Sequence, residues 1–181
     1  PPSSARLLRV GDLDFATWAA SDPPEWPCYA DVPPPRRDLL KASDYTCMWP
    51  AGRNARVETL FPEVATVRTS TGCPHRCNFC VVHFLASGKY LQRSPEEVVD
   101  ELAALPQRRV YFVDDEMFIN AARTRRIADL LIERGVRKEY ISWARSDTIC
   151  RHPDLFRRWK EAGLRLLYVG LESMDPELLL E

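Results

Sequence analysis

The stretch VATVRT at residues 64–69 and the stretch SPEEVVDELAAL at residues 94–105 together decide the fold. The first is a short run rich in β-branched residues, which is typical of a buried strand. The second opens with Ser94 as an N-cap, Pro95 at the first helical position and Glu97 as the partner of a capping box, and its apolar residues recur at helical spacing. A strand followed by a helix is the repeating unit of a parallel sheet. The two stretches therefore predict a βα unit.

The same alternation continues toward the C-terminus. Further strands are predicted at residues 110–113, 140–144 and 166–171. Helices are predicted between these strands, one ending at Gly135 and the other at Gly163, because glycine commonly follows the last turn of a helix. The sequence therefore predicts an α/β fold with four parallel strands in sequence order.

Residues 1–62 differ in composition from the rest of the chain. Most of the fifteen prolines of the chain lie in this part, in runs such as residues 23–24 and 33–35. Proline removes a backbone donor and interrupts regular structure. We therefore interpret residues 1–62 as a proline-rich linker or wrapping segment and residues 63–181 as the catalytic domain.

The composition is that of an ordinary globular protein, with 45% hydrophobic and 28% charged residues among 181. Lys and Arg total 25 against 26 Asp and Glu, and no run of like charges indicates a binding surface for nucleic acid or anionic lipid. No stretch approaches the roughly 20 apolar residues of a membrane span, and the first residues lack a signal-peptide pattern. We therefore expect a cytoplasmic protein that acts on a small molecule, away from nucleic acid and membranes. The first residue is not Met, and the last residues, 178–181, start an apparent helix, so we expect a fragment of a longer protein.

Three of the six cysteines crowd into residues 73–80, whereas Cys28, Cys47 and Cys150 are scattered. A disulfide framework would space its cysteines more evenly in a smaller chain. The crowded set therefore predicts metal binding. The scattered three are interpreted as small hydrophobic residues and are given no role.

The crowded cysteines form a Cys-x3-Cys-x2-Cys motif at Cys73, Cys77 and Cys80. Three thiolates in one loop can ligate three irons of a cubane and leave the fourth iron open for another ligand. The alternative is a zinc site completed by His75 or His83, because structural zinc takes four protein ligands. Both interpretations stay open at this point.

Polar residues follow each of the later predicted strands. Because the carboxyl ends of parallel strands meet at one edge, where such folds place their ligands, we expect these side chains to gather there. Helix caps and structural ion pairs are the alternatives for each of them. The residues are Asp114, Asp115, Glu116, Arg145, Asp147, Glu172 and Ser173.

With Phe79 before the last cysteine, the motif resembles the Cys-x3-Cys-x-aromatic-Cys signature of the radical S-adenosylmethionine superfamily. The resemblance implies a 4Fe-4S cluster held by Cys73, Cys77 and Cys80. It also implies that S-adenosylmethionine binds the open iron through its amino and carboxylate groups. Reductive cleavage would then give a 5′-deoxyadenosyl radical, with electrons from a donor such as flavodoxin or ferredoxin.

The resemblance also implies a fold and a set of cofactor contacts. The core of this family is a partial (β/α) barrel, so residues 63–181 would supply its first four βα units and leave an open edge at the fourth strand. Phe79 would lie along the adenine of S-adenosylmethionine, and no catalytic residue is assigned. The residues expected to bind the cofactor are Phe79, Asp114, Asp115, Glu116, Arg145 and Glu172.

Four further stretches are similar to the cobalamin-dependent branch of the superfamily, which contains methyltransferases and an anaerobic ring cyclase. They lie at residues 69–74, 88–97, 113–118 and 169–173, and residues 32–40 resemble the linker that follows a cobalamin domain in that branch. The cobalt-binding motif Asp-x-His-x2-Gly is absent from the chain, so cobalamin would bind to a domain outside it.

We expect a methyltransferase or a related oxidoreductase of this branch. A methylthiotransferase is the alternative within the superfamily, although neither its extra cysteines nor a basic nucleic-acid surface is apparent. A non-catalytic zinc or iron-sulfur module is the alternative from a different class. Such a module would need the cysteines but not the polar residues after the later strands.

Overall fold

The computed structural model describes residues 35–50, 54, 56 and 60–175. Its central sheet has four parallel strands in the order β1-β4-β5-β6. They are β1 (Ala65–Val67), β4 (Arg109–Phe112), β5 (Glu139–Arg145) and β6 (Leu164–Gly170). The predicted α/β fold, with parallel strands in sequence order, is therefore confirmed. Within the described residues, the sheet ends at β6, which is the edge expected at the fourth strand.

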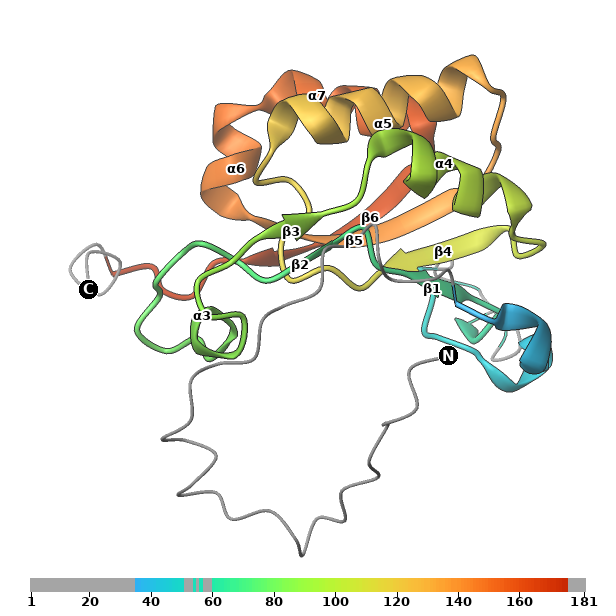
Figure 1. The fold of residues 1–181 in the computed structure, drawn as a ribbon, viewed down its shortest axis with the longest axis horizontal. Helices are drawn as coiled ribbons and strands as arrows, with labels where there is room; N and C mark the ends of the chain where they lie inside the picture. Colours follow the sequence, from blue (N-terminus) through green and yellow to red (C-terminus); the bar gives the residue numbers. More distant parts are fainter. Residues whose placement is uncertain (1–34, 51–53, 55, 57–59, 176–181) are drawn as a thin grey trace, which may run out of the picture.

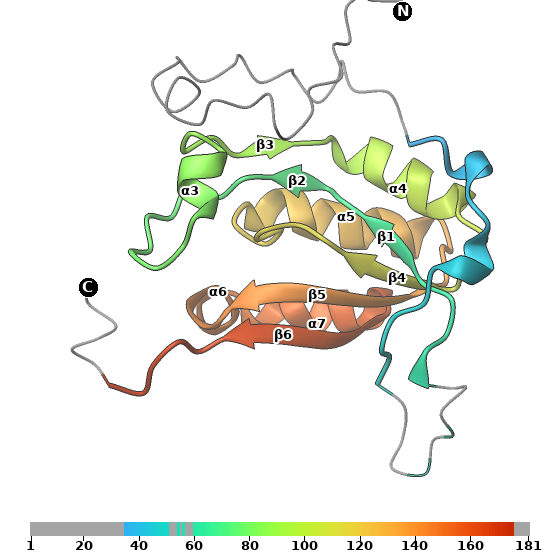
Figure 2. The ribbon, with the colours of Figure 1, turned by 90° about the horizontal axis from the view of Figure 1, so that it is seen from below.

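Three helices cover one face of this sheet (Figure 1). They are α4 (Pro95–Ala104), α5 (Ala121–Glu133) and α7 (Pro153–Ala162). Figure 2 shows the sheet from its other side, with the carboxyl ends of the strands toward one end of the molecule. Parallel strands with helices on one face form the wall of a (β/α) barrel. We call the face of the sheet opposite these helices the inner face.

The helix ends follow the signals in the sequence. Ser94 Oγ accepts a hydrogen bond from Glu97 N at 3.2 Å, and a Glu97 carboxylate oxygen accepts one from Ser94 N at 2.8 Å. The predicted capping box of α4 is therefore confirmed. α7 ends at Gly163, where φ is +119° and a side chain would collide with the Lys138 carbonyl oxygen. Glycine is required at that position.

The hydrophobic core lies between the sheet and its helices. Trp159 of α7 is fully buried and packs edge-on against Phe112 and Tyr140, with ring centroids 5.7 and 6.0 Å apart. Edge-to-face rings add to the stabilisation that burial provides. The alternate residues of β5, Tyr140 and Ala144, belong to this core, whereas Ile141 belongs to a separate cluster on the inner face. Neighbouring residues of β5 therefore face opposite sides of the sheet, as expected for a strand.

Four short elements were not predicted from the sequence. They are β2 (Ser70–Thr71) and β3 (Leu91–Gln92), which pair in an antiparallel ribbon, and the helices α3 (Val82–Leu85) and α6 (Ser146–Arg151). Two-residue strands are too short to show a period of two. α6 follows β5 directly, and its N-cap residue, Arg145, makes no side-chain cap hydrogen bond.

The described part of the N-terminal segment lies against the domain. It contains two 3-10 helices, η3 (Arg37–Leu39) and η4 (Ala42–Asp44). Arg37 Nη2 donates to Glu101 of α4 at 2.6 Å, and Trp49 is buried beside Val64 and Ile141 on the inner face. These contacts fit a wrapping segment. Residues 1–34 lie outside the described part, and the division at residue 62 stays a prediction.

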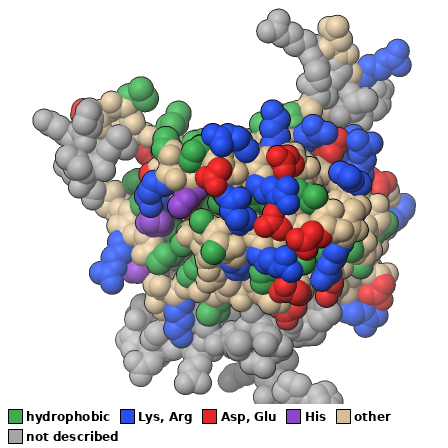
Figure 3. All heavy atoms as spheres, turned by 90° about the horizontal axis from the view of Figure 1, so that it is seen from above, with side chains coloured by type: hydrophobic (Ala, Val, Ile, Leu, Met, Phe, Trp, Pro, Cys, Tyr) green, Lys and Arg blue, Asp and Glu red, His purple; other side chains and the backbone are tan. Residues whose placement is uncertain are grey.

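The outer surface over the helices carries both signs of charge. Figure 3 shows Lys and Arg side chains interspersed with Asp and Glu on this side of the molecule. Ion pairs such as Arg158 with Asp129, at 2.6 Å, account for part of this mixture. Among the described helices, none is long and apolar enough to cross a membrane.

Candidate functional site

The three motif cysteines lie in the loop between β2 and α3, at the carboxyl ends of the strands (Figure 2). All three thiols are free and partly buried. The loop turns tightly between Cys77 and Cys80, because Cys80 N donates to the Cys77 carbonyl oxygen at 3.0 Å. Gly72 precedes Cys73 with φ +83°, and a side chain there would collide with the Lys89 carbonyl oxygen. The entry into the loop therefore requires glycine.

Two consecutive carboxylates after β4 hold the start of this loop. Asp114 is buried, and its carboxylate accepts hydrogen bonds from the backbone amides and hydroxyls of Thr69 and Ser70, at 2.5 to 3.1 Å. Asp115 accepts a bond from Gly72 N at 2.8 Å. Burial raises the pKa of Asp114, and the donors from Ser70 and Thr69 oppose that rise. The two side chains fix the backbone immediately before Cys73.

Glu116 connects the carboxyl ends of β4 and β5. Its side chain is buried, and its two carboxylate oxygens accept hydrogen bonds from Phe118 N at 2.9 Å and from Arg145 N at 2.7 Å. Burial raises its pKa, and these two amides oppose the rise. Glu116 therefore sets the position of Arg145.

Arg145 reaches from the end of β5 to the cysteine loop. Its Nη1 lies 3.5 Å from Cys77 Sγ, and its Nε donates to Asp147 at 2.9 Å. Arg151 also pairs with Asp147. The expected alternative of an ion pair between Arg145 and Asp147 is therefore confirmed, and the same guanidinium faces a cysteine. Arg145 therefore places a positive charge beside one of the three sulfurs of the motif.

The chemistry of the three thiols can be compared with what zinc and a cubane each require. Among the described residues, no group of three or more His, Cys, Asp or Glu side chains is placed to hold one metal ion. Zinc would need four ligands around one centre, whereas a cubane distributes three thiolates over three irons. His83, one of the two expected zinc ligands, has its ring packed against Gly88. The donor set of three thiolates beside Arg145 therefore suits an iron-sulfur cluster.

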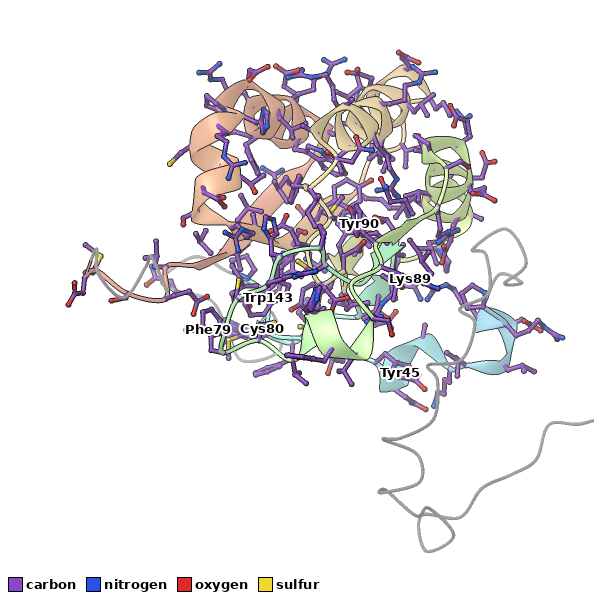
Figure 4. The ribbon with its side chains drawn as sticks, turned by 60° about the vertical axis from the view of Figure 1, so that its left-hand side comes forward. Tyr45, Phe79, Cys80, Lys89, Tyr90 and Trp143 are labelled. Atoms are coloured by element: carbon purple, nitrogen blue, oxygen red, sulfur yellow. The ribbon has the colours of Figure 1, made fainter. Side chains whose placement is uncertain are left out.

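Two of the predicted cofactor residues lie at the surface. Phe79 is 66% exposed within the cysteine loop, close to Cys80 (Figure 4). Glu172 follows β6, is exposed and has φ +54°, with its carboxylate turned back toward Gly170. The structure thus brings Asp114, Asp115, Glu116 and Arg145 together around the loop, and places Glu172 beyond the strand end. The assignment of all six residues to cofactor binding stays a prediction.

Arg123 of α5 is a residue of the site that the sequence analysis did not identify. It is buried, and its guanidinium donates to the Thr69 carbonyl oxygen and the Arg93 carbonyl oxygen, each at 2.7 Å. It therefore joins the backbone on either side of the β2–β3 ribbon. Its position four residues before Ile127, on the apolar face of a predicted helix, was a usable signal, because a buried arginine needs acceptors.

A cavity of about 510 Å³ lies away from this loop. Its lining includes Tyr45, Cys47, Ala65, Leu105 and Gln107, so it opens beside the amino end of β1 and contains none of the motif cysteines. Ligands of parallel α/β sheets bind at the carboxyl ends of the strands. We therefore place the functional site at the cysteine loop.

The comparisons with known proteins agree with this location. A family model described as "Radical SAM superfamily" matches residues 67–181. The chain belongs to the radical SAM superfamily. The match includes the cysteine loop and all four strands except the first two residues of β1.

Two curated relatives are methylases of one compound class. The chain is 30% identical over 176 residues to the hopanoid C-3 methylase of Methylococcus capsulatus, covering 94% of this chain and 32% of that protein. It is 26% identical to the hopanoid C-2 methylase of Rhodopseudomonas palustris, covering 64% of this chain and 23% of that protein. The chain thus spans about a third or less of these relatives.

A solved structure has the same fold. It is the radical S-adenosylmethionine methyltransferase TsrM from Kitasatospora setae, with tryptophan substrate and an S-adenosylmethionine analogue bound. The TM-score is 0.54 at 24% identity, covering 64% of this chain and 23% of that one. This likeness supports the predicted partial (β/α) barrel.

Proposed function

We propose that the full-length protein is a radical S-adenosylmethionine methyltransferase that acts on a small molecule. The observation that carries this proposal is the cysteine loop, whose entry is held by Asp114 and Asp115 and whose Cys77 faces Arg145. The hopanoid methylases support the methyl-transfer part. They also favour an apolar, multi-ring substrate, because hopanoids are compounds of that kind.

In this proposal, Cys73, Cys77 and Cys80 hold the 4Fe-4S cluster, as the family membership implies. The bound cluster and S-adenosylmethionine would supply one-electron reductive cleavage of the sulfonium bond. The residues of the chain hold the components in place. The buried carboxylates of Asp114 and Glu116 bond to backbone amides, so they fix the loop and Arg145 before any ligand arrives.

Arg145 has an electrostatic role at this site. Its guanidinium contacts both the Cys77 sulfur and the Asp147 carboxylate. These two contacts keep its positive charge beside the cysteine loop. Phe79, exposed beside Cys80, offers a ring face to the adenine, and Glu172 supplies an acceptor at the end of β6. Cobalamin is proposed as the methyl carrier, on the similarity of residues 69–74 and 169–173 to the cobalamin-dependent branch.

The test uses the full-length protein, reconstituted without oxygen. We expect about four irons and four sulfides per chain, and cleavage of S-adenosylmethionine to 5′-deoxyadenosine with a chemical reductant or with reduced flavodoxin. The variants Cys73→Ala, Cys77→Ala and Cys80→Ala should lose both properties. Cys150→Ala is the matched control, because Cys150 is an exposed free cysteine outside the loop, and it should keep both.

The outcomes separate the alternative classes. Iron binding without cleavage of S-adenosylmethionine would indicate a non-catalytic module. Cleavage without transfer of a methyl group to any apolar ring compound would reject the methyltransferase assignment. Equal iron loss in Cys150→Ala and Cys77→Ala would refute the ligand assignment.

A further inference from the structure

Three aromatic side chains line the inner face of the sheet, one on each of three neighbouring strands. They are Tyr111 of β4, Trp143 of β5 and Tyr168 of β6, and we call them the aromatic wall. Trp143 and Tyr168 are register partners, and their rings stack with centroids 4.8 Å apart and an interplanar angle of 30°. Tyr111 and Tyr168 have centroids 6.3 Å apart. The three rings form one continuous surface.

Each residue of the wall carries one polar group on an apolar ring, and the polar group of Trp143 is used within the wall. Trp143 is 45% exposed, and its indole Nε1 donates to Tyr111 Oη at 2.5 Å. An indole has one donor and no acceptor. Because that donor is already used within the wall, the exposed part of Trp143 offers only ring surface to a ligand. Such a surface favours apolar and ring-shaped ligands over polar ones.

The wall adjoins the cysteine loop. Trp143 and Arg145 are two residues apart on β5, so they share the inner face and their Cα atoms lie about 7 Å apart. Arg145 in turn lies 3.5 Å from Cys77 Sγ. Figure 4 shows Trp143 on the side of the sheet where Phe79 and Cys80 lie. A molecule on the wall would therefore have one end beside the cluster loop.

The end of the wall away from the cysteine loop packs against a buried apolar cluster, which we call the floor. Trp49, Val64 and Ile141 form a small apolar cluster, and Tyr111 and Tyr168 pack against it. The Arg109 guanidinium lies over the Trp49 ring, 5.7 Å from its centroid. This cluster supports the two tyrosines where the wall meets the floor. The space available to a ligand is bounded by the floor at one end and the cysteine loop at the other.

We propose that the aromatic wall of Tyr111, Trp143 and Tyr168 is the substrate-binding surface, and that it binds an extended apolar ring system. This inference rests on the proposed function and names the part of the chain that selects the substrate class. Burial of apolar ligand surface against the three ring faces supplies the binding free energy. The three wall positions carry no carboxylate that could pair with an ammonium group, so the wall itself disfavours a free amino acid.

The test measures binding of a hopanoid hydrocarbon in detergent micelles to the full-length reconstituted protein, with free tryptophan as the polar comparison. Trp143→Ala should weaken hopanoid binding about tenfold, which corresponds to about 1.4 kcal/mol. Trp143→Phe keeps a ring, so it should weaken binding by no more than about twofold. Val169→Ala is the matched control, because Val169 is adjacent to Tyr168 but on the opposite face of β6, and it should leave binding unchanged.

Thermal unfolding and iron content are recorded for each variant, so that a misfolded protein is recognised. Tyr168→Ala, which removes the ring stacked on Trp143 and should also weaken hopanoid binding, carries the test if Trp143→Ala misfolds. The inference is overturned if the wild type binds free tryptophan more tightly than the hopanoid. It is equally overturned if Trp143→Ala and Val169→Ala weaken binding alike. The proposed function is tested separately, because it fails if the wild type does not cleave S-adenosylmethionine, whatever the hopanoid measurement gives.

Discussion

The Arg145 guanidinium lies 3.5 Å from the sulfur of Cys77, while its own backbone amide donates to the buried carboxylate of Glu116 at 2.7 Å. The two bonds connect the end of β5 to the cysteine loop on one side and to the end of β4 on the other. A cation next to a cluster thiolate favours the more negative, reduced state of the cluster. Arg145 is therefore placed to influence how readily the proposed 4Fe-4S cluster would accept an electron.

Replacing Arg145 should change the reduction potential of the cluster. In Arg145→Gln, we expect the midpoint potential to fall by about 60 mV, or a tenfold change in the one-electron equilibrium. Arg145→Lys, which keeps the charge, should lie closer to the wild type. The potential is measured by redox titration with electron paramagnetic resonance, without S-adenosylmethionine.

Arg151→Gln serves as the control for that titration. Arg151 also pairs with Asp147, and in the described part of the chain it does not bond to a cysteine, so its removal should shift the potential less than Arg145→Gln does. An equal shift in the two variants would mean that the general charge of the region, and not the contact with Cys77, sets the potential.

Asp114 should be essential for the stability of the domain. Its carboxylate accepts hydrogen bonds from the amides and hydroxyls of Thr69 and Ser70. An amide side chain in its place would leave some of these buried donors without an acceptor. We expect Asp114→Asn to lower the free energy of unfolding by about 2–4 kcal/mol. Denaturant unfolding of the full-length protein measures this change.

The control for Asp114 is Asp129→Asn. Asp129 is a partly exposed carboxylate of α5 that pairs with Arg158, so its replacement should cost much less stability. Similar losses in the two variants would contradict the anchoring role given to Asp114.

Part of the stability should depend on pH through Glu116. Burial raises the pKa of this residue above its ordinary value of 4.5, so the folded state holds the proton more tightly than the unfolded state. Its contribution is therefore complete below about pH 4.5 and is lost as the pH rises through the folded pKa. The difference in unfolding free energy between the wild type and Glu116→Gln should accordingly fall as the pH rises from below 4.5 through the raised pKa of the folded state. A difference that grows with pH would show that the folded protein prefers the carboxylate.

Gly72 tests whether the entry to the loop is as tight as the structure indicates. In Gly72→Ala, a Cβ would meet the Lys89 carbonyl oxygen and Ala86, so we expect loss of most of the bound iron. Gly135→Ala is a close control, because Gly135 also has positive φ, +65°, but has open space where the Cβ would be. That variant should lose only about 1 kcal/mol of stability and keep its iron. Retention of full iron content by Gly72→Ala would show that the loop can shift without consequence.

The sequence predicts the sheet and its main helices well, for identifiable reasons. α4 has a capping box and an apolar stripe, and α7 has a proline start and a glycine end, so local chemistry alone marks them. The cysteine spacing likewise predicts metal binding without any knowledge of the fold, whereas the 4Fe-4S cluster is implied by the family resemblance and stays a prediction. These features depend on residues close together in the chain.

The roles of the carboxylates depend on contacts that the sequence does not show. Asp114, Asp115 and Glu116 were expected at the carboxyl ends of the strands, and they lie there. Their partners, however, are backbone amides of Ser70, Gly72 and Arg145, which are far away in the chain. Only the tertiary structure shows which amides lack a backbone partner and therefore need an acceptor.

The aromatic wall was missed for a related reason. Trp143 lies in a predicted strand, but the sequence does not tell which face of that strand meets the helices. Tyr140 and Ala144 take that face, so Trp143 is left on the inner face, where Tyr168 comes alongside through strand pairing.

The most direct test of the central claim is a hyperfine measurement on the full-length protein. The cluster is reduced without oxygen in the presence of S-adenosylmethionine labelled with 15N at its amino group, and the coupling of that nitrogen to the cluster spin is measured. If Cys73, Cys77 and Cys80 leave one iron open to the cofactor, a 15N coupling appears in the wild type and in Cys150→Ala. A fully loaded cluster that shows no 15N coupling in either protein would contradict the account.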